Sequence, residues 1–406
     1  MRRLAVISFH TSPLTQPGAG DGGGMNVYVR ELSSALAGAG VDCDVYTRSW
    51  RKGLPLVQEV EPGFRVHHVP AGPQASVAKE DLAEHLDEFA AGVLERIEVD
   101  GPPDVVHANY WLSGVAGHTL KHRLELPLVS TFHTLARVKA EEAAEEHDRR
   151  ARAEAEVVGC SDAILASSAA EAAQLERLYG AVPDRIEIVP PGVDHHLFSP
   201  GDQREARALL GLGDGPVLLF VGRIQPLKGA DVAVRALAAL PEGPEPATLL
   251  LVGGPSGPEG EAELARLHHL VADLGLAKRV RFLPPRPHGE LAAFYRAADV
   301  CLVPSRSESF GLVALEAAAC GTPVVAAAVG GLRTLVAHGV SGYLVDGRDP
   351  EAYAAYVAKL LGDPAVAAGM SVEAATRASG YRWSIAAARL RRLYADLTAR
   401  RLVECT

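Results

Sequence analysis

Two carboxylates, Glu308 and Glu316, lie close together in the second half of the chain, with seven residues between them. The apolar run Val300–Val303 predicts a strand, and residues 311–320 predict a short helix that ends at Gly321. Glu308 is then expected in the loop between strand and helix, and Glu316 inside the helix. Free N–H groups at a helix start bind anions, and carboxylates accept hydrogen bonds from hydroxyl groups. The pattern predicts a site for a nucleotide-sugar, a ligand with both phosphates and hydroxyls.

Two cations follow another expected strand. Arg223 and Lys228 lie in the loop 222–229, directly after the apolar run Val217–Val221. Ligands of open parallel sheets bind at the carboxyl ends of the strands. An arginine fork and a lysine point charge together suit a diphosphate. We therefore expect both side chains to stabilise the charge that develops on a diphosphate leaving group.

A glycine-rich loop near the N-terminus is a third candidate site. Its glycines directly precede an expected helix at residues 25–36, so that the backbone can approach a ligand closely with its amides free. We expect this loop to meet phosphate or sugar oxygens of the ligand; its residues are Gln16, Pro17, Asp21, Gly22, Gly23, Gly24, Met25 and Asn26.

Strand-like runs alternate with amphipathic helical stretches along the whole chain, which is typical of α/β proteins with parallel sheets. A strand, a glycine-containing loop and a helix open both halves, so we expect two Rossmann-like, doubly wound domains. The Pro- and Gly-containing segment 189–200 predicts a linker between them. The expected domains are residues 1–195, residues 196–382 and a terminal helical segment, residues 383–406.

Composition narrows the function classes. The chain has 406 residues and a net charge of −10, which argues against a nucleic-acid-binding surface. The apolar run at the N-terminus is short and predicts a first strand instead of a signal peptide, and no run is long enough to span a bilayer. The five cysteines are scattered without a C-x-x-C spacing. These features predict a cytoplasmic protein with reduced thiols.

Two further patterns predict no chemistry. The charged tract at residues 140–156 predicts a solvated helix with Glu and Arg at helical spacing. Asp42-Cys-Asp44 matches a D-x-D metal motif that is known from enzymes of a different fold, but the surrounding pattern has the wrong architecture for that fold, so we interpret this match as chance.

The segment around Glu308 and Glu316, with Ser-Phe-Gly-Leu-Val-Ala-Leu between the acids and Cys-Gly-Thr-Pro-Val-Val after them, resembles the retaining glycosyltransferases of family 4. The resemblance implies the GT-B architecture: two Rossmann-like domains facing a central cleft, with a terminal helix, here about residues 383–401, crossing back to the first domain. It implies that Glu308 binds a sugar hydroxyl and Glu316 the ribose. Other donor-binding positions that it implies are Arg223, Lys228, Arg286, Phe310, Gly311 and Leu312.

The first half is similar to those family members that glycosylate inositol phosphate in mycothiol biosynthesis. The similar segments are His10-Thr-Ser-Pro, the glycine-rich loop, His107-Ala-Asn-Tyr-Trp-Leu-Ser-Gly and Phe132-His-Thr-Leu-Ala-Arg-Val-Lys. The resemblance implies transfer of N-acetylglucosamine from UDP-N-acetylglucosamine to 1L-myo-inositol 1-phosphate with retention, and His133 shaping the site near the anomeric carbon. The acceptor-binding residues that it implies are His10, Lys79, Tyr110, Thr134 and Arg150.

The resemblance also bears on cofactors and partners. No cofactor is expected for the chemistry itself. Family members carry a structural ion, here taken as magnesium, near positions that match Tyr295, Arg296, Ala298 and Thr322. The expected partners are a nucleotide-sugar and a small phosphorylated polyol, without nucleic acid, and a homodimer formed through the first domain would fit the family.

Other functions remain open at this stage. The sequence departs from the family at residues 79–83, at residues 154–156 and in a shortened segment between Lys139 and Arg150, all in the acceptor half. The main alternative is therefore a related family 4 transferase with the same donor and another acceptor: a sugar phosphate as in sucrose-phosphate synthesis, an aminocyclitol or a lipid. A nucleotide-sugar epimerase would need acids and bases around the sugar that the sequence does not offer. A non-catalytic binding protein is expected to have lost Arg223, Lys228 or Glu308.

Overall fold

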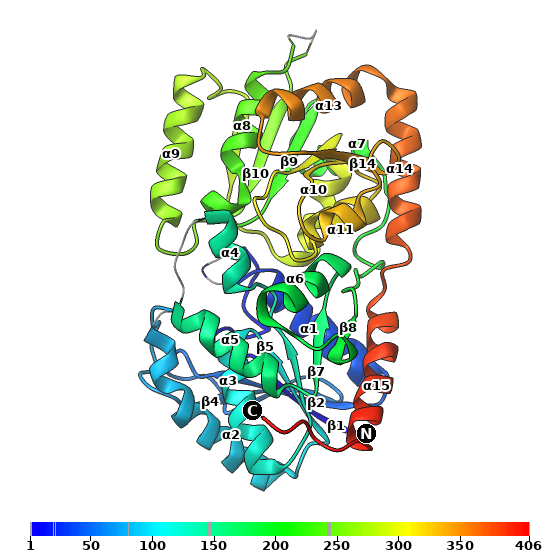
Figure 1. Ribbon diagram of the computed structural model, residues 1–406. Helices are drawn as coiled ribbons and strands as arrows, with labels where there is room; N and C mark the ends of the chain where they lie inside the picture. Colours follow the sequence, from blue (N-terminus) through cyan, green and yellow to red (C-terminus); the bar gives the residue numbers. More distant parts are fainter. Residues whose placement is uncertain are drawn as a thin grey trace. The chain divides into compact units, whose positions relative to one another are not determined.

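The computed structural model describes residues 2–18, 20, 22–79, 81–143, 148–241 and 245–405. The chain forms two compact units (Figure 1). The first unit consists of Met1–Thr15, Met25–Gly192 and Trp383–Thr406, and the second of Gln16–Gly24 and Val193–Arg382. The glycine-rich loop thus belongs with the second unit, although its sequence lies in the first half.

The first unit is built on an eight-stranded sheet with the order β3-β4-β2-β1-β5-β6-β7-β8. The pairs are parallel except β3–β4, which is antiparallel. The strands are β1 (Arg3–Ile7), β2 (Asp42–Arg48), β3 (Val57–Glu61), β4 (Phe64–Val69), β5 (Val105–Asn109), β6 (Leu128–Thr131), β7 (Ala163–Ala166) and β8 (Ile186–Ile188).

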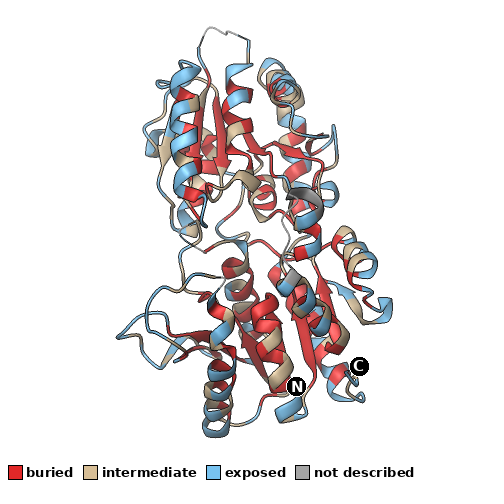
Figure 2. Ribbon diagram, turned by 60° about the vertical axis from the view of Figure 1, so that its left-hand side comes forward, coloured by how far each residue is buried: buried red, intermediate tan, exposed pale blue. Residues whose placement is uncertain are grey.

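Helices connect these strands, as parallel pairing requires. Figure 2 shows that the strands are mostly buried and that many helices expose one side. The helical elements of this unit are α1 (Gly24–Gly38), η1 (Asp81–His85), α2 (Leu86–Asp100), α3 (Trp111–Leu124), α4 (Ala136–Ala143), α5 (Asp148–Cys160), α6 (Ala169–Tyr179), η2 (Pro183–Arg185) and α15 (Trp383–Thr398).

The second unit has an all-parallel, six-stranded sheet with the order β11-β10-β9-β12-β13-β14. Its strands are β9 (Val217–Val221), β10 (Thr248–Val252), β11 (Val280–Leu283), β12 (Val300–Val303), β13 (Val324–Ala327) and β14 (Gly342–Val345). Its helical elements are α7 (Gln203–Leu209), η3 (Pro226–Lys228), α8 (Ala230–Ala238), α9 (Gly260–Asp273), η4 (His288–Glu290), α10 (Leu291–Ala297), α11 (Leu312–Ala319), α12 (Leu332–Leu335), α13 (Pro350–Gly362) and α14 (Pro364–Ala378).

The terminal helix α15 returns to the first unit, as expected from the family resemblance. Its residues Trp383, Leu390 and Tyr394 are buried in a core together with strand residues of the first sheet. The Tyr394 hydroxyl also lies 2.8 Å from Nδ1 of His107 in β5. This helix therefore stabilises the first unit from a position at the far end of the sequence.

The α/β architecture predicted from the sequence is confirmed. The strands Val217–Val221 and Val300–Val303 begin and end where the apolar runs do. The antiparallel edge strand β3 was not expected from its sequence Val-Gln-Glu-Val-Glu, and all five of its residues are partly or fully exposed. Within the described residues, no helix is long and apolar enough to cross a membrane.

Two expectations need correction. The charged tract is not a solvated helix throughout, because Glu154 in α5 is fully buried. The cysteines are also not all free thiols, since Cys160 at the end of α5 forms a disulfide with Cys405 in the C-terminal tail.

The Asp42-Cys-Asp44 match has a structural explanation. Asp44 is buried and accepts hydrogen bonds from Arg3, Arg65 and His67. Burial alone would raise the pKa of this carboxyl group, but the bonds from His67, Arg65 and Arg3 lower it to about 2. Asp44 therefore holds neighbouring strands together as a buried anion.

Candidate active site

The glycine-rich loop packs against strand ends of the second unit. The Gly254 N–H donates to the Gly18 carbonyl at 3.2 Å, and the Ser256 hydroxyl donates to the Gly20 carbonyl at 2.5 Å. A Cβ atom on Gly23 would lie 3.3 Å from Nε of Arg223. The loop and Arg223, expected separately to bind the donor, are thus neighbours.

The remaining loop residues have different placements. Asp21 lies outside the described residues. Gln16 is exposed, Pro17 is half-buried, and the Gly22 carbonyl accepts from the Gly18 N–H, which closes the loop on itself. Met25 and Asn26 belong to the first unit, where the Asn26 amide donates to the Thr11 hydroxyl and the Ser12 carbonyl.

Lys228 and Glu308 form an ion pair in the second unit. The Lys228 ammonium group lies 2.5 Å from Oε1 of Glu308, and the Ser305 hydroxyl donates to the same oxygen at 2.9 Å. Both partners are about three-quarters buried or more, with side-chain exposures of 26% and 17%. The pair holds a cation and a hydrogen-bond acceptor ready beside each other, as a bound phosphate and sugar hydroxyl would require.

Two glycines near this ion pair allow two backbone segments to pack closely against each other. Gly229 has a φ of +75°, and a Cβ there would lie 2.2 Å from the Pro304 carbonyl oxygen. Gly330 has a φ of +44°, and a Cβ there would lie 1.9 Å from the carbonyl oxygen of Glu308. Because any larger residue would collide with backbone, these glycines are needed to place Lys228 and Glu308.

Arg223 lies at the same edge of the sheet, two residues after β9. Its Nη1 is 3.5 Å from the Ser256 hydroxyl, and the amide of Gln225 donates to the same serine. β9 is flanked by β10 and β12, so the cation lies near the middle of the parallel sheet. This is the edge where ligands of such sheets bind.

Glu316 is buried inside α11, as the sequence predicts for a helical position. One carboxylate oxygen lies 2.7 Å from His288 Nε2, and the other accepts from the Tyr295 hydroxyl at 2.8 Å. His288 and Tyr295 therefore orient the carboxylate; the sequence pattern around Glu316 did not reveal either partner.

The other expected donor positions surround the start of α11. Gly311 precedes this helix with a φ of +107°, where a Cβ would lie 2.6 Å from Leu332. Phe310 is buried with its ring 5.7 Å from that of Tyr381, and Leu312 begins the helix. The half-buried Arg286 has an Nε atom without a hydrogen-bond partner among the residues that the structure describes.

The four positions expected near magnesium offer few suitable ligands. The Tyr295 carbonyl accepts from the Thr322 hydroxyl at 2.6 Å, and the Ala298 carbonyl accepts from the Gln203 amide at 3.2 Å. Arg296 donates to Ser199 and Leu197. The set contains no carboxylate, whereas magnesium is usually held by at least one. These residues do not fit a tight magnesium site, so no step of the reaction is assigned to that ion.

The five expected acceptor residues meet around one aromatic ring in the first unit. The His10 ring lies 4.5 Å from that of Tyr110, the Lys79 ammonium group lies 4.5 Å from its centre, and the Arg150 guanidinium lies 4.9 Å from it. Arg150 also donates to the hydroxyl and carbonyl oxygens of Thr134, at 3.0 and 2.7 Å. The ring thus supports two cations, which is a favourable arrangement for an anionic ligand.

Parallel strand order explains why these residues converge. His10 follows β1 and Tyr110 follows its neighbour β5, so both lie at the carboxyl edge of the sheet. Thr134 follows β6, the next strand in the order. Lys79 and Arg150 reach the ring from a loop and from α5.

Buried Glu154 fixes the position of Arg150. Its Oε1 lies 2.7 Å from Nε of Arg150, and its Oε2 accepts from the Ala136 N–H at 2.9 Å and from the Tyr179 hydroxyl. Arg150 is thus paired with Glu154 and at the same time contacts Thr134 and Tyr110. We interpret Glu154 as a positioning residue, whose burial the sequence did not reveal because the charged tract predicted a solvated helix.

His133 is held in an uncommon backbone conformation next to this cluster. Its φ is +62°, its Nε2 lies 2.9 Å from the side-chain oxygen of Asn109, and its ring lies 4.9 Å from that of Tyr28. Tyr110 has a φ of +78°, so left-handed residues follow both β5 and β6. Such strain at neighbouring strand ends is common in functional sites. Burial, with a smaller effect of His107, lowers the pKa of His133 to about 3, so the ring is neutral near pH 7.

Comparisons with known proteins agree with this geometry. Residues 22–197 match the model of Glycosyltransferase Family 4, and residues 202–377 match that of Glycosyl transferases group 1. The D-inositol 3-phosphate glycosyltransferase of Acidothermus cellulolyticus is 49% identical over 100% of this chain and 92% of its own length. That of Frankia alni is 50% identical over 95% of this chain and 97% of its own length.

The chain belongs to the family of D-inositol 3-phosphate glycosyltransferases. The fold of this family is confirmed by a solved structure, the sucrose-phosphate synthase of Thermosynechococcus elongatus, which is 36% identical with a TM-score of 0.92 and covers 98% of this chain and 100% of its own. As a glycosyltransferase of GT-B fold, the chain carries its donor candidates, except Met25 and Asn26, in the second unit and its acceptor candidates in the first.

Proposed function

We propose that this glycosyltransferase moves N-acetylglucosamine from UDP-N-acetylglucosamine to 1L-myo-inositol 1-phosphate, which is D-inositol 3-phosphate, with retention at the anomeric carbon. The observation that carries the acceptor assignment is the pair of cations, Lys79 and Arg150, supported by the ring of Tyr110. A phosphate needs cations, and a polyol needs the neutral hydrogen-bonding groups that Tyr110 and Thr134 supply. Relatives that share 49% and 50% of their aligned residues with this chain are named for this acceptor.

The donor assignment rests on the second unit. Arg223 and Lys228 supply two positive charges at the carboxyl edge of a parallel sheet, where the diphosphate of a nucleotide-sugar would bind. The Glu308 carboxylate, next to Lys228, accepts hydrogen bonds from sugar hydroxyls. Glu316, held by His288 and Tyr295, accepts from the ribose, and Arg286 lies near the base.

In the proposed reaction, the bond between the anomeric carbon and the UDP oxygen breaks as the acceptor hydroxyl attacks from the same face. The hydroxyl proton passes to the departing phosphate oxygen, so UDP leaves with the electron pair of the broken bond. Arg223 and Lys228 stabilise the charge that grows on this leaving group. No side-chain nucleophile or base is needed, and the low pKa of His133, due to burial, agrees with a neutral, shaping role for its ring.

A second candidate shares the donor and differs in the acceptor. The likeness to a sucrose-phosphate synthase, at 36% identity, favours a sugar phosphate as that alternative acceptor. Both acceptors carry a phosphate and hydroxyl groups, so the cluster around Tyr110 suits either class. Identity near 49% with relatives named for inositol phosphate makes the inositol acceptor the better supported one.

Location and assembly complete the proposal. UDP-sugars are cytoplasmic metabolites, so a cytoplasmic enzyme is expected. A homodimer formed through the first unit stays a prediction from the family resemblance.

The experiment is UDP release from UDP-N-acetylglucosamine by the purified enzyme, with and without 1L-myo-inositol 1-phosphate, next to an Arg223→Ala variant. The proposal predicts release that depends on this acceptor and is nearly lost in the variant. Release that depends instead on a sugar phosphate would establish the second candidate. Absence of release with every UDP-sugar would overturn the donor assignment as well.

A further inference from the structure

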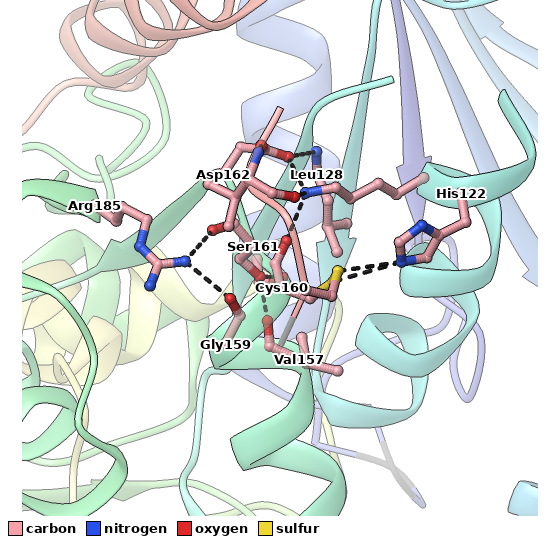
Figure 3. Close-up of a disulfide and its surroundings, with 12 residues drawn as sticks. His122, Leu128, Val157, Gly159, Cys160, Ser161, Asp162 and Arg185 are labelled. Carbon is pink, nitrogen blue, oxygen red and sulfur yellow. Dashed lines mark hydrogen bonds and ion pairs between the residues drawn. A yellow bond between two sulfur atoms is a disulfide. The ribbon is translucent and has the colours of Figure 1, made fainter. Parts of the chain in front are cut away.

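Four side chains of the types that bind zinc converge in the first unit, outside the sites described above. His118 and His122 lie one turn apart on α3, Cys160 ends α5, and Cys405 lies in the C-terminal tail. Their ligand atoms all lie within 4.8 Å of one another. Nε2 of His122 is 3.1 Å from the Cys405 sulfur and 3.6 Å from the Cys160 sulfur, and Figure 3 shows the His122 ring directed at the sulfur of Cys160.

A separate, buried ion pair brings the tail to this place. The Lys121 ammonium group lies 2.9 Å from the Asp162 carboxylate and also donates to the carbonyls of Cys160 and Val403, at 2.7 and 3.0 Å. The other Asp162 oxygen accepts from the Val403 N–H at 2.6 Å. Both polar groups of the Val403 backbone are therefore fixed in the fold, and Cys405 follows two residues later.

The disulfide does not explain why His118 and His122 lie beside it. A bond between Cys160 and Cys405 needs the two sulfurs alone, yet two imidazoles approach the same point. Histidines four residues apart lie on one face of a helix and form a recurrent zinc-binding pair. Two cysteines and two histidines are a common ligand set of structural zinc sites.

We propose that the reduced protein binds one structural zinc ion through His118, His122, Cys160 and Cys405. Zinc–sulfur and zinc–nitrogen bonds of about 2.3 and 2.0–2.1 Å would place tetrahedral ligand atoms roughly 3.3–3.8 Å apart. The observed ligand atoms already lie within 4.8 Å, so side-chain rotation can close the set around an ion. All four positions are filled by protein, which makes the site structural, with no open position for catalysis.

The disulfide and the zinc site are alternative states of the same cysteines. Two molecules of a thiol reductant open the sulfur–sulfur bond, giving two protein thiols and one disulfide of the reductant. Zinc then displaces one proton from each thiol and is held by two thiolates and two neutral imidazoles. In a reducing compartment the dithiol form prevails. The ion then joins α3, the end of α5 and the tail that follows α15.

The test uses the full-length protein, purified anaerobically with a phosphine reductant and then dialysed against trace zinc. Metal is counted by mass spectrometry, and a parallel sample receives cobalt, whose visible bands report tetrahedral geometry and whose ultraviolet charge-transfer band reports thiolate ligands. The variants are Cys405→Ser and His118→Ala, and the matched control is His269→Ala, which removes an exposed histidine of the second unit.

We expect about one zinc per chain in the wild type and in the control, and near-complete loss in both variants. Cobalt should give tetrahedral bands and thiolate charge transfer in the wild type and in the control, but not in Cys405→Ser or His118→Ala. A chelator should lower the melting temperature of the reduced wild type but not that of Cys405→Ser. A reduced wild type without stoichiometric zinc would overturn the proposal. So would zinc that persists in both variants, since the ion would then lie elsewhere.

Discussion

Glu154 offers a sharp test of how the acceptor cluster is positioned. The substitution Glu154→Gln keeps the size of the side chain and an oxygen that can accept from the Ala136 N–H, but it removes the charge that faces Arg150. Glu154 is fully buried and the Arg150 side chain is only 11% exposed, so water cannot replace the lost interaction. Loss of one partner of a fully buried ion pair costs 3–5 kcal/mol, and a charged hydrogen bond contributes about 1.5–3 kcal/mol. Because the amide retains part of the bonding, we expect the free energy of unfolding to fall by about 2–3 kcal/mol.

The same substitution should weaken the acceptor specifically. Without its carboxylate partner, Arg150 no longer has a fixed orientation over the ring of Tyr110. A loss of about 1.4 kcal/mol in phosphate binding corresponds to a tenfold change, so we expect the KM for inositol phosphate to rise about tenfold. The KM for the UDP-sugar should stay nearly constant, because Arg223, Lys228 and Glu308 belong to the other unit.

The assays are urea unfolding and initial rates of UDP release at varied acceptor and donor concentrations. Glu156→Gln is the matched control, since it makes the same change at an exposed position of the same helix. The control should behave like the wild type in both assays. The reasoning is refuted if Glu154→Gln unfolds at wild-type urea concentrations with an unchanged acceptor KM, or if both KM values rise equally.

Three further predictions concern the donor site and the scaffold. Lys228→Ala should lower kcat by about 10²–10³-fold, because a charge that stabilises the leaving group is lost; an unchanged kcat in steady-state assays would exclude this role. Gly330→Ala should cost about 1–3 kcal/mol of stability, since its Cβ would lie 1.9 Å from the Glu308 carbonyl, whereas Gly362→Ala, with open space around it, should not destabilise the fold in the same urea titration. The pKa of Asp44, which hydrogen bonds lower to about 2 despite burial, makes its carboxylate a source of about 2 kcal/mol of stability above pH 4 that is lost as the pH falls towards 2. Asp44→Asn should remove this part of the acid sensitivity, and an unaltered pH profile of the melting temperature would contradict the assignment.

The sequence predicted those parts of the fold that depend on local patterns. The apolar run Val217–Val221 indicated a buried parallel strand, and the segment around Glu308 and Glu316 indicated a strand, a loop and a helix in the observed order. The edge strand β3 was missed because a partly exposed strand with three polar residues lacks that signal.

Other features depend on contacts between distant parts of the chain, which no local pattern encodes. The burial of Glu154 follows from Tyr179 and Arg150 packing around it. Cys160 and Cys405 are 245 residues apart, and only the path of the tail over Asp162 brings them together. The glycine-rich loop lies next to Arg223 because residues 16–24 belong to the second unit although the residues before and after them belong to the first. The sequence of each segment by itself indicated only phosphate binding.

The most direct test of the account is the structure of the reaction product. The enzyme would be incubated with UDP-N-acetylglucosamine and 1L-myo-inositol 1-phosphate, and the purified product examined by proton and phosphorus NMR. We predict an N-acetylglucosaminyl-inositol phosphate whose anomeric proton shows the small coupling of an α-linkage, as in the donor, with the phosphate still on the inositol ring. A β-linked product, or a product in which the sugar is attached to the phosphate, would contradict the proposed retaining transfer to an inositol hydroxyl.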